Sequence, residues 1–385
     1  MDFTYDEEQQ ALREAVRGLV GKAYSDFENR RRAVAEDPGF DEQLWGRLAE
    51  MGILGLPFRE EDGGSGAGPV EVAIVAEELG RVIAPEPYLA SVVLAGGMVA
   101  AAGTAEQRAE VLGALSAGEC VLGWAHAEPG ASGAARWSAT AAAVTASGSG
   151  TEWTLSGVKE PVVAGARADR LVVSAALPDG GTGLFLVDPA GPSVTRAGYP
   201  THDGGRAARV GLDEAPAVPL GEPGADLTAT IAVVLDIGRV MACAEALGAM
   251  DVALASTTDY LRNRKQFGVP LSTFQALTFR AADMYVSLEL ARSVTTWATM
   301  VVAAGRPEQV ADAAARAALQ TSRAGRHLGQ EAIQLHGGIG MTAEYAVGSY
   351  TSRLTALDHL LGDGDHHLRR LASTVGEHGE VDPLP

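Results

Sequence analysis

The sequence predicts an α+β protein built from several domains: a helical region, a central β-domain and a bundle of long helices. The 385 residues are enough for two or three packed units. Apolar residues recur at helical spacing on both sides of a segment in which short β-prone runs alternate with turn residues. Three long alanine-rich stretches without internal proline follow that segment and suit antiparallel packing. We therefore expect domains over residues 1–118, 119–224 and 225–385.

The first domain is expected to be helical. Thr4 and Glu7 have the spacing of a capping box, and they precede an apolar stripe formed by Leu12, Val16, Leu19, Val20 and Ala23. Asp41 can cap a second helix, and Thr104 with Gln107 repeats the capping-box pattern for another. Further helical spacing covers residues 69–83 and 88–102.

The segment between Cys120 and Gly224 has a different residue pattern from the helical regions on either side. Gly, Pro, Asp and Ser separate its short β-prone runs at strand-and-turn spacing. The runs are CVLGWA, AAVTA, EWTLSGV, RLVVSAAL, GLFLVD and ARVGL. They predict an all-β domain of roughly one hundred residues, a usual domain size.

Long helices return in the last domain, and we expect them over residues 226–264, 273–304 and 307–336. The stretch RLTALDHLLGDGDHH follows at 353–367. It begins as an apolar helical stripe and then breaks at two glycines among aspartates and histidines. This pattern fits either a hinge between two helices or a site that holds a catalytic base.

Composition and charge restrict the class of protein. The net charge of −19 argues against nucleic acid or an anionic membrane as the main partner. No apolar run is long enough to span a bilayer, and the acidic N-terminus does not resemble a signal peptide. Two cysteines, Cys120 and Cys243, make no disulfide framework. These features together predict a cytoplasmic protein.

A basic segment ends the first long helix. In YLRNRKQFGVPLSTFQ, residues 260–275, three cations lie just before Gly268 and Pro270. Cations near a helix C-terminus are favoured by the helix dipole, so an ordinary helix stop explains the pattern. The alternative is that Arg264 binds a phosphate through its guanidinium, with Gln266 and Gln275 adding amide hydrogen bonds.

A glycine-rich segment ends the third long helix. In QLHGGIGMTAEY, residues 334–345, Gln334 and His336 flank Gly337 and Gly338. Glycines at this place allow a ligand to approach the backbone and leave amides free. A glycine-rich helix C-cap is the alternative reading of the same residues.

Both segments, in this order, resemble signatures of the acyl-CoA dehydrogenase family. RKQFGVPLSTFQA is similar to that family's arginine-x-glutamine-phenylalanine-glycine motif, and QLHGGIGMTAEY to its C-terminal glycine motif. AEPGASG, residues 127–133, resembles the threonine-glutamate-proline-glycine motif of its middle domain, and LSGVKEPVVAGARAD the strand that follows. The resemblance implies an N-terminal helical domain, a central β-barrel-like domain and a C-terminal four-helix bundle.

The resemblance also implies an activity and a cofactor. Family members bind FAD and remove hydrogen from the α and β carbons of an acyl-CoA thioester, within fatty acid metabolism. They form dimers or tetramers and pass electrons to an electron-transfer partner. By resemblance, the cofactor-binding residues from the bundle would act on FAD shared between subunits: Arg264, Gln266, Phe267, Gln275, Gln334, Gly337 and Gly338.

The β-domain departs from the family pattern at the place expected to hold the flavin ring. Ala127 stands where the motif has threonine, and Gly133 where it has serine, although Ser132 is adjacent. The usual aromatic-x-threonine-asparagine reads Pro161 to Ala164. Trp124 offers a ring near the expected flavin face, and a buried strand tryptophan is its alternative reading.

The base positions are also altered. The family places its glutamate at one of two positions, which fall here on Leu361 and on Gly238, the residue before Arg239. The nearest carboxylates are Asp363 and Asp236, which we consider weak candidates for a base. Asp363 is expected to cap the final helix, and His366 and His367 are expected on that helix's exposed face.

Three hypotheses follow from this resemblance. The chain is an acyl-CoA dehydrogenase that acts alone, a non-catalytic subunit of a heteromeric one, or another flavoenzyme on the same fold. The vacant base positions and the altered β-domain motifs favour the non-catalytic subunit.

Overall fold

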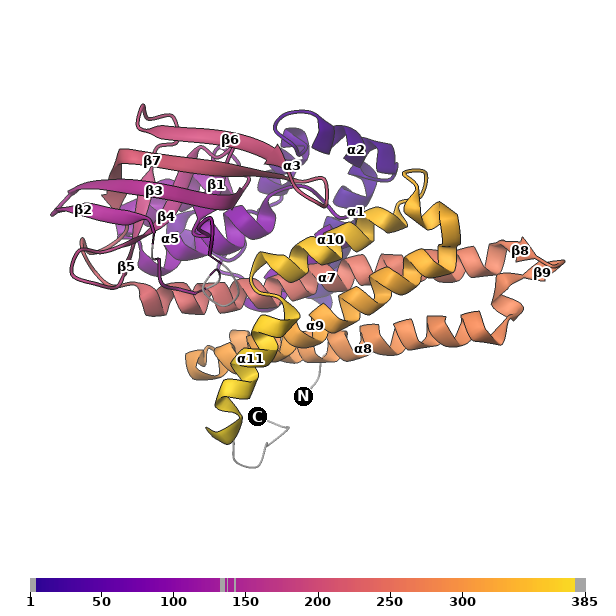
Figure 1. Cartoon of the computed structure of the whole chain (residues 1–385). Coiled ribbons are helices and arrows are strands. Elements are labelled where there is room, and N and C mark those ends of the chain that lie inside the picture. The colour runs from indigo at the N-terminus through magenta and orange to yellow at the C-terminus, as the bar shows by residue number, and fades with distance from the viewer. Residues whose placement is uncertain (1–4, 132–135, 137, 142, 378–385) are drawn as a thin grey trace.

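The computed structural model describes residues 5–131, 136, 138–141 and 143–377. The β-domain lies at one end of the elongated molecule, and the long helices run from it to a small hairpin at the other end (Figure 1). The N-terminal helices pack beside the sheet and the near half of the bundle. The predicted fold class is confirmed.

Six α-helices and two short irregular helices make up the N-terminal part that the structure describes. They are α1 (Glu7–Ala23), α2 (Phe27–Ala35), α3 (Glu42–Glu50), η1 (Glu60–Asp62), α4 (Pro69–Arg81), η2 (Tyr88–Gly96), α5 (Gly97–Ala102) and α6 (Ala105–Ser116). Asp41 caps α3, and Thr104 with Gln107 forms the predicted capping box of α6. The capping box of α1 belongs to Asp6 and Gln9, whereas Thr4 lies outside the described residues.

The structure differs from the prediction of a single helix over residues 88–102. Its first part, η2, is a π-helical segment in which every residue is buried, and a short α5 continues from it. A segment that is apolar on all sides has no solvent face. It therefore packs along its whole circumference between the β-domain and the bundle.

Seven strands form the sheet of the central domain. They are β1 (Leu122–Ala125), β2 (Thr145–Ser149), β3 (Glu152–Val163), β4 (Arg170–Ala176), β5 (Thr182–Val187), β6 (Val194–Pro200) and β7 (Arg206–Pro219). The pairings β4–β5, β5–β7, β7–β3, β3–β2 and β2–β4 form a closed ring, so the sheet is barrel-like. β1 adds to β4 in parallel, and β6 adds to β7.

The bundle consists of α7 (Thr228–Asn263), α8 (Gln275–Ala303), α9 (Pro307–His336) and α10 (Val347–Leu360), and α11 (Gly364–Thr374) packs against it. The three long helices begin and end within two residues of the predicted limits. The hairpin β8 (Lys265–Gln266) and β9 (Val269–Pro270) joins α7 to α8 at the far end. One hydrophobic core is shared by the N-terminal helices and the bundle, and a second fills the barrel.

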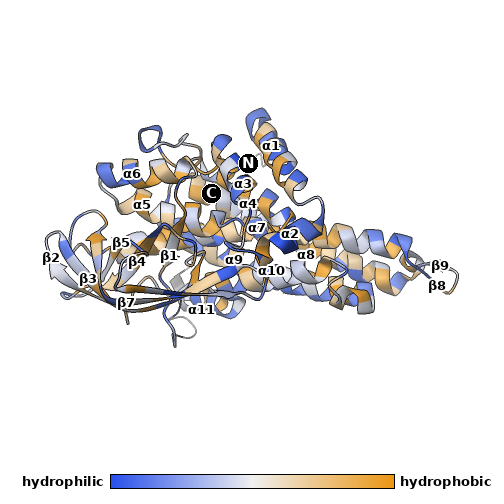
Figure 2. Ribbon diagram, turned by 90° about the horizontal axis from the view of Figure 1, so that it is seen from above, coloured by the Kyte–Doolittle hydropathy of each residue, from blue (hydrophilic) through white to orange (hydrophobic). Residues whose placement is uncertain are grey.

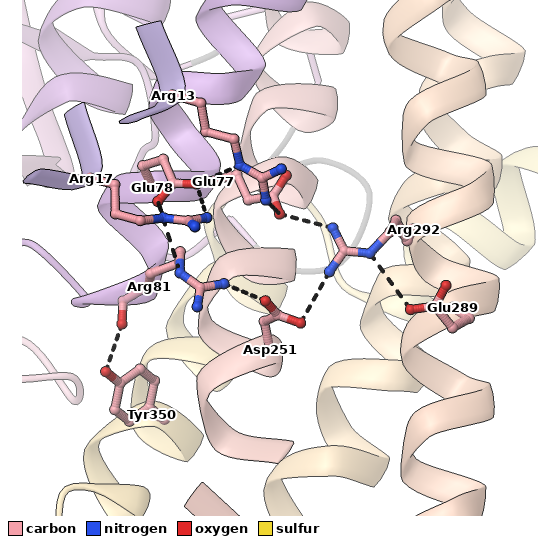
Figure 3. Close-up of polar contacts among 9 residues, drawn as sticks. All are labelled: Arg13, Arg17, Glu77, Glu78, Arg81, Asp251, Glu289, Arg292 and Tyr350. Atoms are coloured by element: carbon pink, nitrogen blue, oxygen red, sulfur yellow. Dashed lines mark hydrogen bonds and ion pairs between the residues drawn. The ribbon is translucent and has the colours of Figure 1, made fainter. Parts of the chain in front are cut away.

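An ion-pair network fixes the N-terminal helices to the bundle (Figure 3). Glu77 and Glu78 of α4 are buried, and arginines of α1 pair with Glu78. Arg292 of α8 bridges Glu77 and Asp251 of α7, with Nη1 2.8 Å from Glu77 Oε1. Arg81 of α4 also pairs with Asp251. Removing one partner would leave a buried charge uncompensated, so this contact holds the domains in one orientation.

Within the described part of the chain, no helix is both long and apolar enough to cross a membrane. The same residues contain no cluster of His, Cys, Asp or Glu able to hold a metal ion.

Candidate functional site

The basic segment predicted as a phosphate site forms an exposed tip of the bundle. Arg264 is the C-cap residue of α7, and its exposed side chain makes no ion pair with any described residue. Gln266 lies in β8 and is exposed. Phe267, at the turn, is 91% exposed and has a left-handed φ of 55°, with its ring edge toward Phe274. The tip therefore presents a free cation, an amide and an aromatic ring to the outside.

The glycine-rich segment lies at the same end of the bundle. The ring of His336, at the end of α9, stacks on Tyr260 of α7 with centroids 4.6 Å apart. Gln334, two residues before His336, is exposed. Gly337 has a φ of 67°, and neither Gly337 nor Gly338 has any atom within 4 Å of the place where a Cβ would stand. The backbone is consequently open to a ligand.

These two segments lie far from the β-domain of their own chain. Figures 1 and 2 both place the β8–β9 hairpin and the strands at opposite ends of the molecule. Gln275, the first residue of α8, is also exposed at the hairpin end. The structure thus brings together the predicted residues of the bundle and separates them from Trp124 of β1. Ser132 lies outside the described residues.

Trp124 is a buried core residue rather than an exposed flavin platform. It is 7% exposed, and its ring stacks on His126 with centroids 5.0 Å apart and an interplanar angle of 8°. Nε2–H of His126 donates to the carbonyl oxygen of Ser138 at 2.7 Å, so Nδ1 accepts from the hydroxyl of Ser174 at 2.7 Å. Burial, with nearby Lys159 acting in the same direction, lowers the pKa of His126 to about 4. The imidazole is therefore neutral.

Lys159 occupies the centre of this polar cluster in the barrel. Its ammonium group donates to the backbone oxygen of His126 at 3.0 Å, to Glu128 Oε1 at 2.8 Å and to Ser174 Oγ at 3.2 Å. Burial lowers the pKa of Lys159 to about 8, and the Glu128 carboxylate opposes that shift. All three protons of the ammonium group have acceptors, so the cluster joins β3 to the segment after β1.

The two positions where the family pattern has its glutamate lie against each other. A Cβ added at Gly238 of α7 would stand 3.2 Å from Leu361 Cδ1 and 2.5 Å from Leu94 Cδ2. Leu361, the C-cap residue of α10, is buried. Leucine side chains thus occupy the space beside Gly238, and any side chain at this position would require the end of Leu94 to shift.

Neither weak candidate for the base is placed to act as one. Asp363 caps α11, as its alternative reading predicts: its Oδ1 accepts from the backbone N–H of His366 at 2.8 Å. Asp236 is buried, and both its oxygens accept from Arg370, at 2.6 and 2.8 Å. Oδ1 of Asp236 also accepts from Arg239 at 2.7 Å. A carboxylate bound by two guanidinium groups is poorly suited to remove a proton.

The prediction that both histidines lie on an exposed face is wrong for His367. This side chain is 1% exposed, and its Nε2–H donates to the backbone oxygen of Gly362 at 3.0 Å. Burial lowers the pKa of His367 to about 3, with Arg239 acting in the same direction. The short α11 packs against α9, and His367 lies with Gly364 on its buried face.

A cavity of about 460 Å³ lies where the three parts of the chain meet. Its wall includes the start of η2, the end of β3, the turn between β6 and β7, and α10. Pro161 and Val163 of β3, at the positions expected to face the flavin, line it together with Leu357 and Leu360 of α10. The cavity therefore adjoins both the flavin-side strand and the last turn of α10, which precedes Leu361.

Sequence reasoning missed a carboxylate on this wall. Glu86 precedes η2 in APEPYLASVV, where it is the only charged residue in a strongly apolar stretch. Its Oε1 accepts from the hydroxyl of Tyr24 at 2.5 Å and from the backbone N–H of Asp41 at 3.2 Å. Burial raises the pKa of Glu86 to about 7. In the sequence, the feature that could have drawn attention to Glu86 is its position as a single carboxylate between Pro85 and Pro87.

The residues present fit one half of an FAD molecule. Arg264, Gln266 and the open backbone at Gly337 suit a pyrophosphate group, which guanidinium and free amides bind well. On the β-domain side, Ala127, Pro161 and Val163 offer the ring no side-chain hydrogen bond. Among the described residues at the predicted positions, the side chains suited to polar contacts with FAD therefore lie at the bundle end.

Comparisons with known proteins agree with this architecture. Residues 6–119 match the family model for the acyl-CoA dehydrogenase N-terminal domain, and residues 228–376 match that for the C-terminal domain. The chain is 33% identical to acyl-CoA dehydrogenase IpdE2 of Mycobacterium tuberculosis, over 97% of this chain and 99% of that protein.

Two solved structures are also similar to this chain. A variant of the Tcur3481–Tcur3483 steroid ACAD is 33% identical, with a TM-score of 0.87 over 96% of this chain and 98% of that one. The ChsE4–ChsE5 complex from Mycobacterium tuberculosis is 29% identical, with a TM-score of 0.87 over 98% of this chain and 100% of that one.

Proposed function

The chain belongs to the acyl-CoA dehydrogenase family, and from that premise we propose that it is the base-lacking subunit of a heteromeric, FAD-dependent acyl-CoA dehydrogenase. It would complete the cofactor site of a related, catalytic subunit. The reaction of the whole assembly is α,β-dehydrogenation of an acyl-CoA thioester.

One observation carries this proposal: the contact between Gly238 and Leu361. The reaction needs a group that removes the α-proton, and that group must reach the α-carbon. Leu94 and Leu361 fill the space around Gly238. Asp236 and Asp363, the nearest carboxylates in sequence, are engaged by arginines and by a helix cap. Glu86, a further carboxylate on the cavity wall, is held by the hydroxyl of Tyr24 and the backbone N–H of Asp41. We therefore assign proton removal to the partner subunit.

The bundle tip supplies this chain's contribution to the shared site. When bound, FAD supplies the acceptor for the β-hydride. Arg264 would bind its pyrophosphate, Gln266 and Gln334 would add amide hydrogen bonds, and Gly337 and Gly338 would admit it to the backbone. Because this tip is remote from the chain's own sheet, these residues can serve only a neighbouring subunit's FAD.

The relatives support the partner and the substrate class of this proposal. Two similar solved structures are named as pairs of different chains, and one of them is named a steroid ACAD. We infer a related subunit as partner and a thioester of a bulky, ring-bearing acid as substrate. An electron-transfer partner would reoxidise the flavin.

The test compares FAD retention in the co-purified complex. Arg264→Ala in this chain should weaken FAD binding by about 1.5–3 kcal/mol, the loss of a charged hydrogen bond. Arg262→Ala is the matched control, because Arg262 is also exposed on the same tip but is paired with Asp259 at 3.6 Å. FAD affinity that stays unchanged with Arg264→Ala would contradict the shared site.

The visible spectrum of the chain purified alone separates this role from the alternatives. A colourless chain that gains flavin only with its partner supports the proposal. A yellow protein with one FAD per chain would instead support an independent dehydrogenase or another flavoenzyme on this fold.

A further inference from the structure

An exposed face of the bundle carries large apolar side chains. It is formed by α8 and α9, which run side by side to the hairpin end (Figure 1). On α8, Phe279, Val286 and Leu290 are 63%, 53% and 54% exposed. Their spacing of seven and then four residues places them on one stripe of the helix. Contiguous apolar surface of this kind is typical of a protein–protein contact rather than of a free monomer.

A contact between the two helices shows that this stripe continues onto α9. Oγ of Ser287 in α8 lies 2.8 Å from Nδ1 of His327 in α9. Asp283 and Leu290 are exposed and lie four residues before and three residues after Ser287, so they flank it on the helix surface. Arg323 lies four residues before His327 and is exposed beside it in the same way. The two stripes together form what we call the bundle face: Phe279, Asp283, Val286, Leu290, Arg323 and Gln330.

The bundle face also carries two charges of opposite sign. Asp283 and Arg323 are exposed, and neither side chain forms a hydrogen bond or an ion pair with any described residue. The neighbouring cation, Arg280 of α8, is by contrast held by Glu331 of α9, with Nε and Nη2 at 2.5 and 2.9 Å from its two oxygens. Asp283 and Arg323 are therefore available to a docked protein, on which opposite charges would fix the register and the orientation.

The positions of these charges define how a partner of the same fold would dock. α8 begins near the hairpin and α9 ends there, so Asp283 lies on the hairpin side of the Ser287–His327 contact and Arg323 on the other side. A two-fold axis through that contact places the position of Arg323 in one subunit over the position of Asp283 in the other. The two helix pairs then lie antiparallel, and each hairpin points toward the β-domain end of the other subunit (Figures 1 and 2).

This orientation is the one that a shared cofactor site requires. Gln334 lies seven residues after His327, so the bundle face continues along α9 into the bundle tip with Gly337 and Gly338. A protein docked on the face therefore also meets the tip. In a parallel orientation the tips of both subunits would lie together, far from either β-domain.

We propose that the bundle face is the docking surface of the related, catalytic subunit, which packs its own helix pair antiparallel on it and sets a cation opposite Asp283 and a carboxylate opposite Arg323. The inference rests on the proposed function, which supplies a partner of the same fold. Phe279, Val286 and Leu290 provide the apolar contact, and the two ion pairs fix its register. Docking thereby carries the bundle tip to the β-domain of the catalytic subunit.

A second copy of this chain fits the same face less well. Its helix pair would offer the same opposite charges, but each copy carries a net charge of −19, which opposes self-association. The tip would also meet a β-domain in which Ala127, Pro161 and Val163 offer the flavin ring no side-chain hydrogen bond. The related subunit is therefore the occupant that the net charge and the tip favour.

The experiment reverses the two charges singly and together in the complex with the partner subunit. Asp283→Arg and Arg323→Asp each set like charges against each other, so each should raise the dissociation constant of the complex about tenfold at low salt. High salt should shrink this effect, because exposed charges are screened. The double variant should lose about a hundredfold in affinity, since the partner keeps its own charges. Light scattering over a dilution series measures the dissociation constant, and Arg369→Asp on α11 and Glu110→Arg on α6, both exposed, are the matched controls.

Two outcomes would overturn the inference. Single variants that bind the partner subunit as tightly as the wild type does would show that the bundle face is not the contact. A loss of association in both single variants that the double variant reverses would assign the face to a second copy of this chain, because only a copy carries both changes at once.

FAD retention separates this inference from the proposed function. At protein concentrations that restore the complex, Arg323→Asp should retain FAD as the wild type does, whereas Arg264→Ala should lose FAD within an intact complex. A complex that loses FAD with Arg264→Ala but is unaffected by both charge reversals defeats the docking surface alone. A complex that dissociates with the charge reversals but keeps FAD with Arg264→Ala contradicts the shared cofactor site and leaves the docking surface standing.

Discussion

Glu86→Gln should change how the stability of the folded chain depends on pH. Burial raises the pKa of Glu86 in the folded state to about 7, from the ordinary value of 4.5 for an exposed glutamate. Between these two values the folded state holds a proton that the unfolded state has lost. Raising the pH therefore destabilises the wild-type fold across this window and has no further effect above it.

The size of this change in stability follows from the width of the pH range between the two pKa values. Each pH unit within it costs about 1.4 kcal/mol, so a change from about pH 5.5 to about pH 8 costs the wild type about 2 kcal/mol through this one group. Glutamine has the same shape, keeps an acceptor for Tyr24 and Asp41, and cannot ionise. Relative to the wild type, the free energy of unfolding of the variant should therefore rise by about 2 kcal/mol over the same pH range.

Other titratable and charged groups lie near this carboxyl. They are Tyr24 at the end of α1, Asp41 before α3, and Arg30, His202, Asp203, Arg206, Glu245, Arg353 and His359 on the cavity wall, together with Arg136. Both proteins share all of them, so the difference between wild type and variant isolates Glu86.

The assay is urea unfolding of wild type, Glu86→Gln and the exposed control Glu110→Gln at several pH values. The difference in the free energy of unfolding between wild type and Glu86→Gln should fall with rising pH, while that for the control stays flat. A difference that does not change with pH would refute the burial argument for Glu86.

The remaining predictions concern the two aspartates and the bundle surface. Asp363→Ala should cost about 1 kcal/mol in thermal unfolding, because the cap of α11 is lost, and Asp363→Ser should restore most of it; an unchanged melting temperature in the alanine variant would contradict the cap. Asp236→Asn should destabilise the fold by about 3–5 kcal/mol, because the buried Arg239 loses the carboxylate that compensates its charge. Normal stability with lost turnover would instead mark Asp236 as a base. Phe279, Val286 and Leu290 are exposed apolar side chains of α8, so Val286→Arg should prevent assembly, as light scattering would show. Leu368→Arg on α11 should not, and an intact oligomer with Val286→Arg would place the interface elsewhere.

The long helices were predictable because their signal is local. Periodic apolar residues, alanine richness and capping residues are all visible in the sequence over residues 226–336, and the observed helices agree within two residues. β6 was missed, since VTRAGYP is largely exposed and shows no alternation of apolar and polar residues. A strand that adds to the edge of β7 is stabilised by its backbone pairing, which the side-chain pattern does not reveal.

Only those residues of the candidate site that belong to recognisable sequence motifs could be predicted. The bundle residues around Arg264 and Gln334 were identified by resemblance, and the structure places their segments together through Tyr260 and His336. Sequence position could not show that Gly238 meets Leu361, because this contact joins residues far apart in the chain. Glu86 was overlooked for the same reason: its burial depends on Tyr24 and Asp41, which belong to other helices.

Turnover by the isolated chain tests the absence of a base most directly. The purified chain, supplied with excess FAD, is assayed by dye reduction over a panel of straight, branched and ring-bearing acyl-CoA thioesters, and then again with its partner subunit. The apolar contact between Gly238 and Leu361 predicts turnover well below about 1 s⁻¹, the low end for ordinary enzymes, for the chain alone, and activity only in the complex. Turnover above that rate by the chain alone would contradict the account and would show that this chain carries a base of its own.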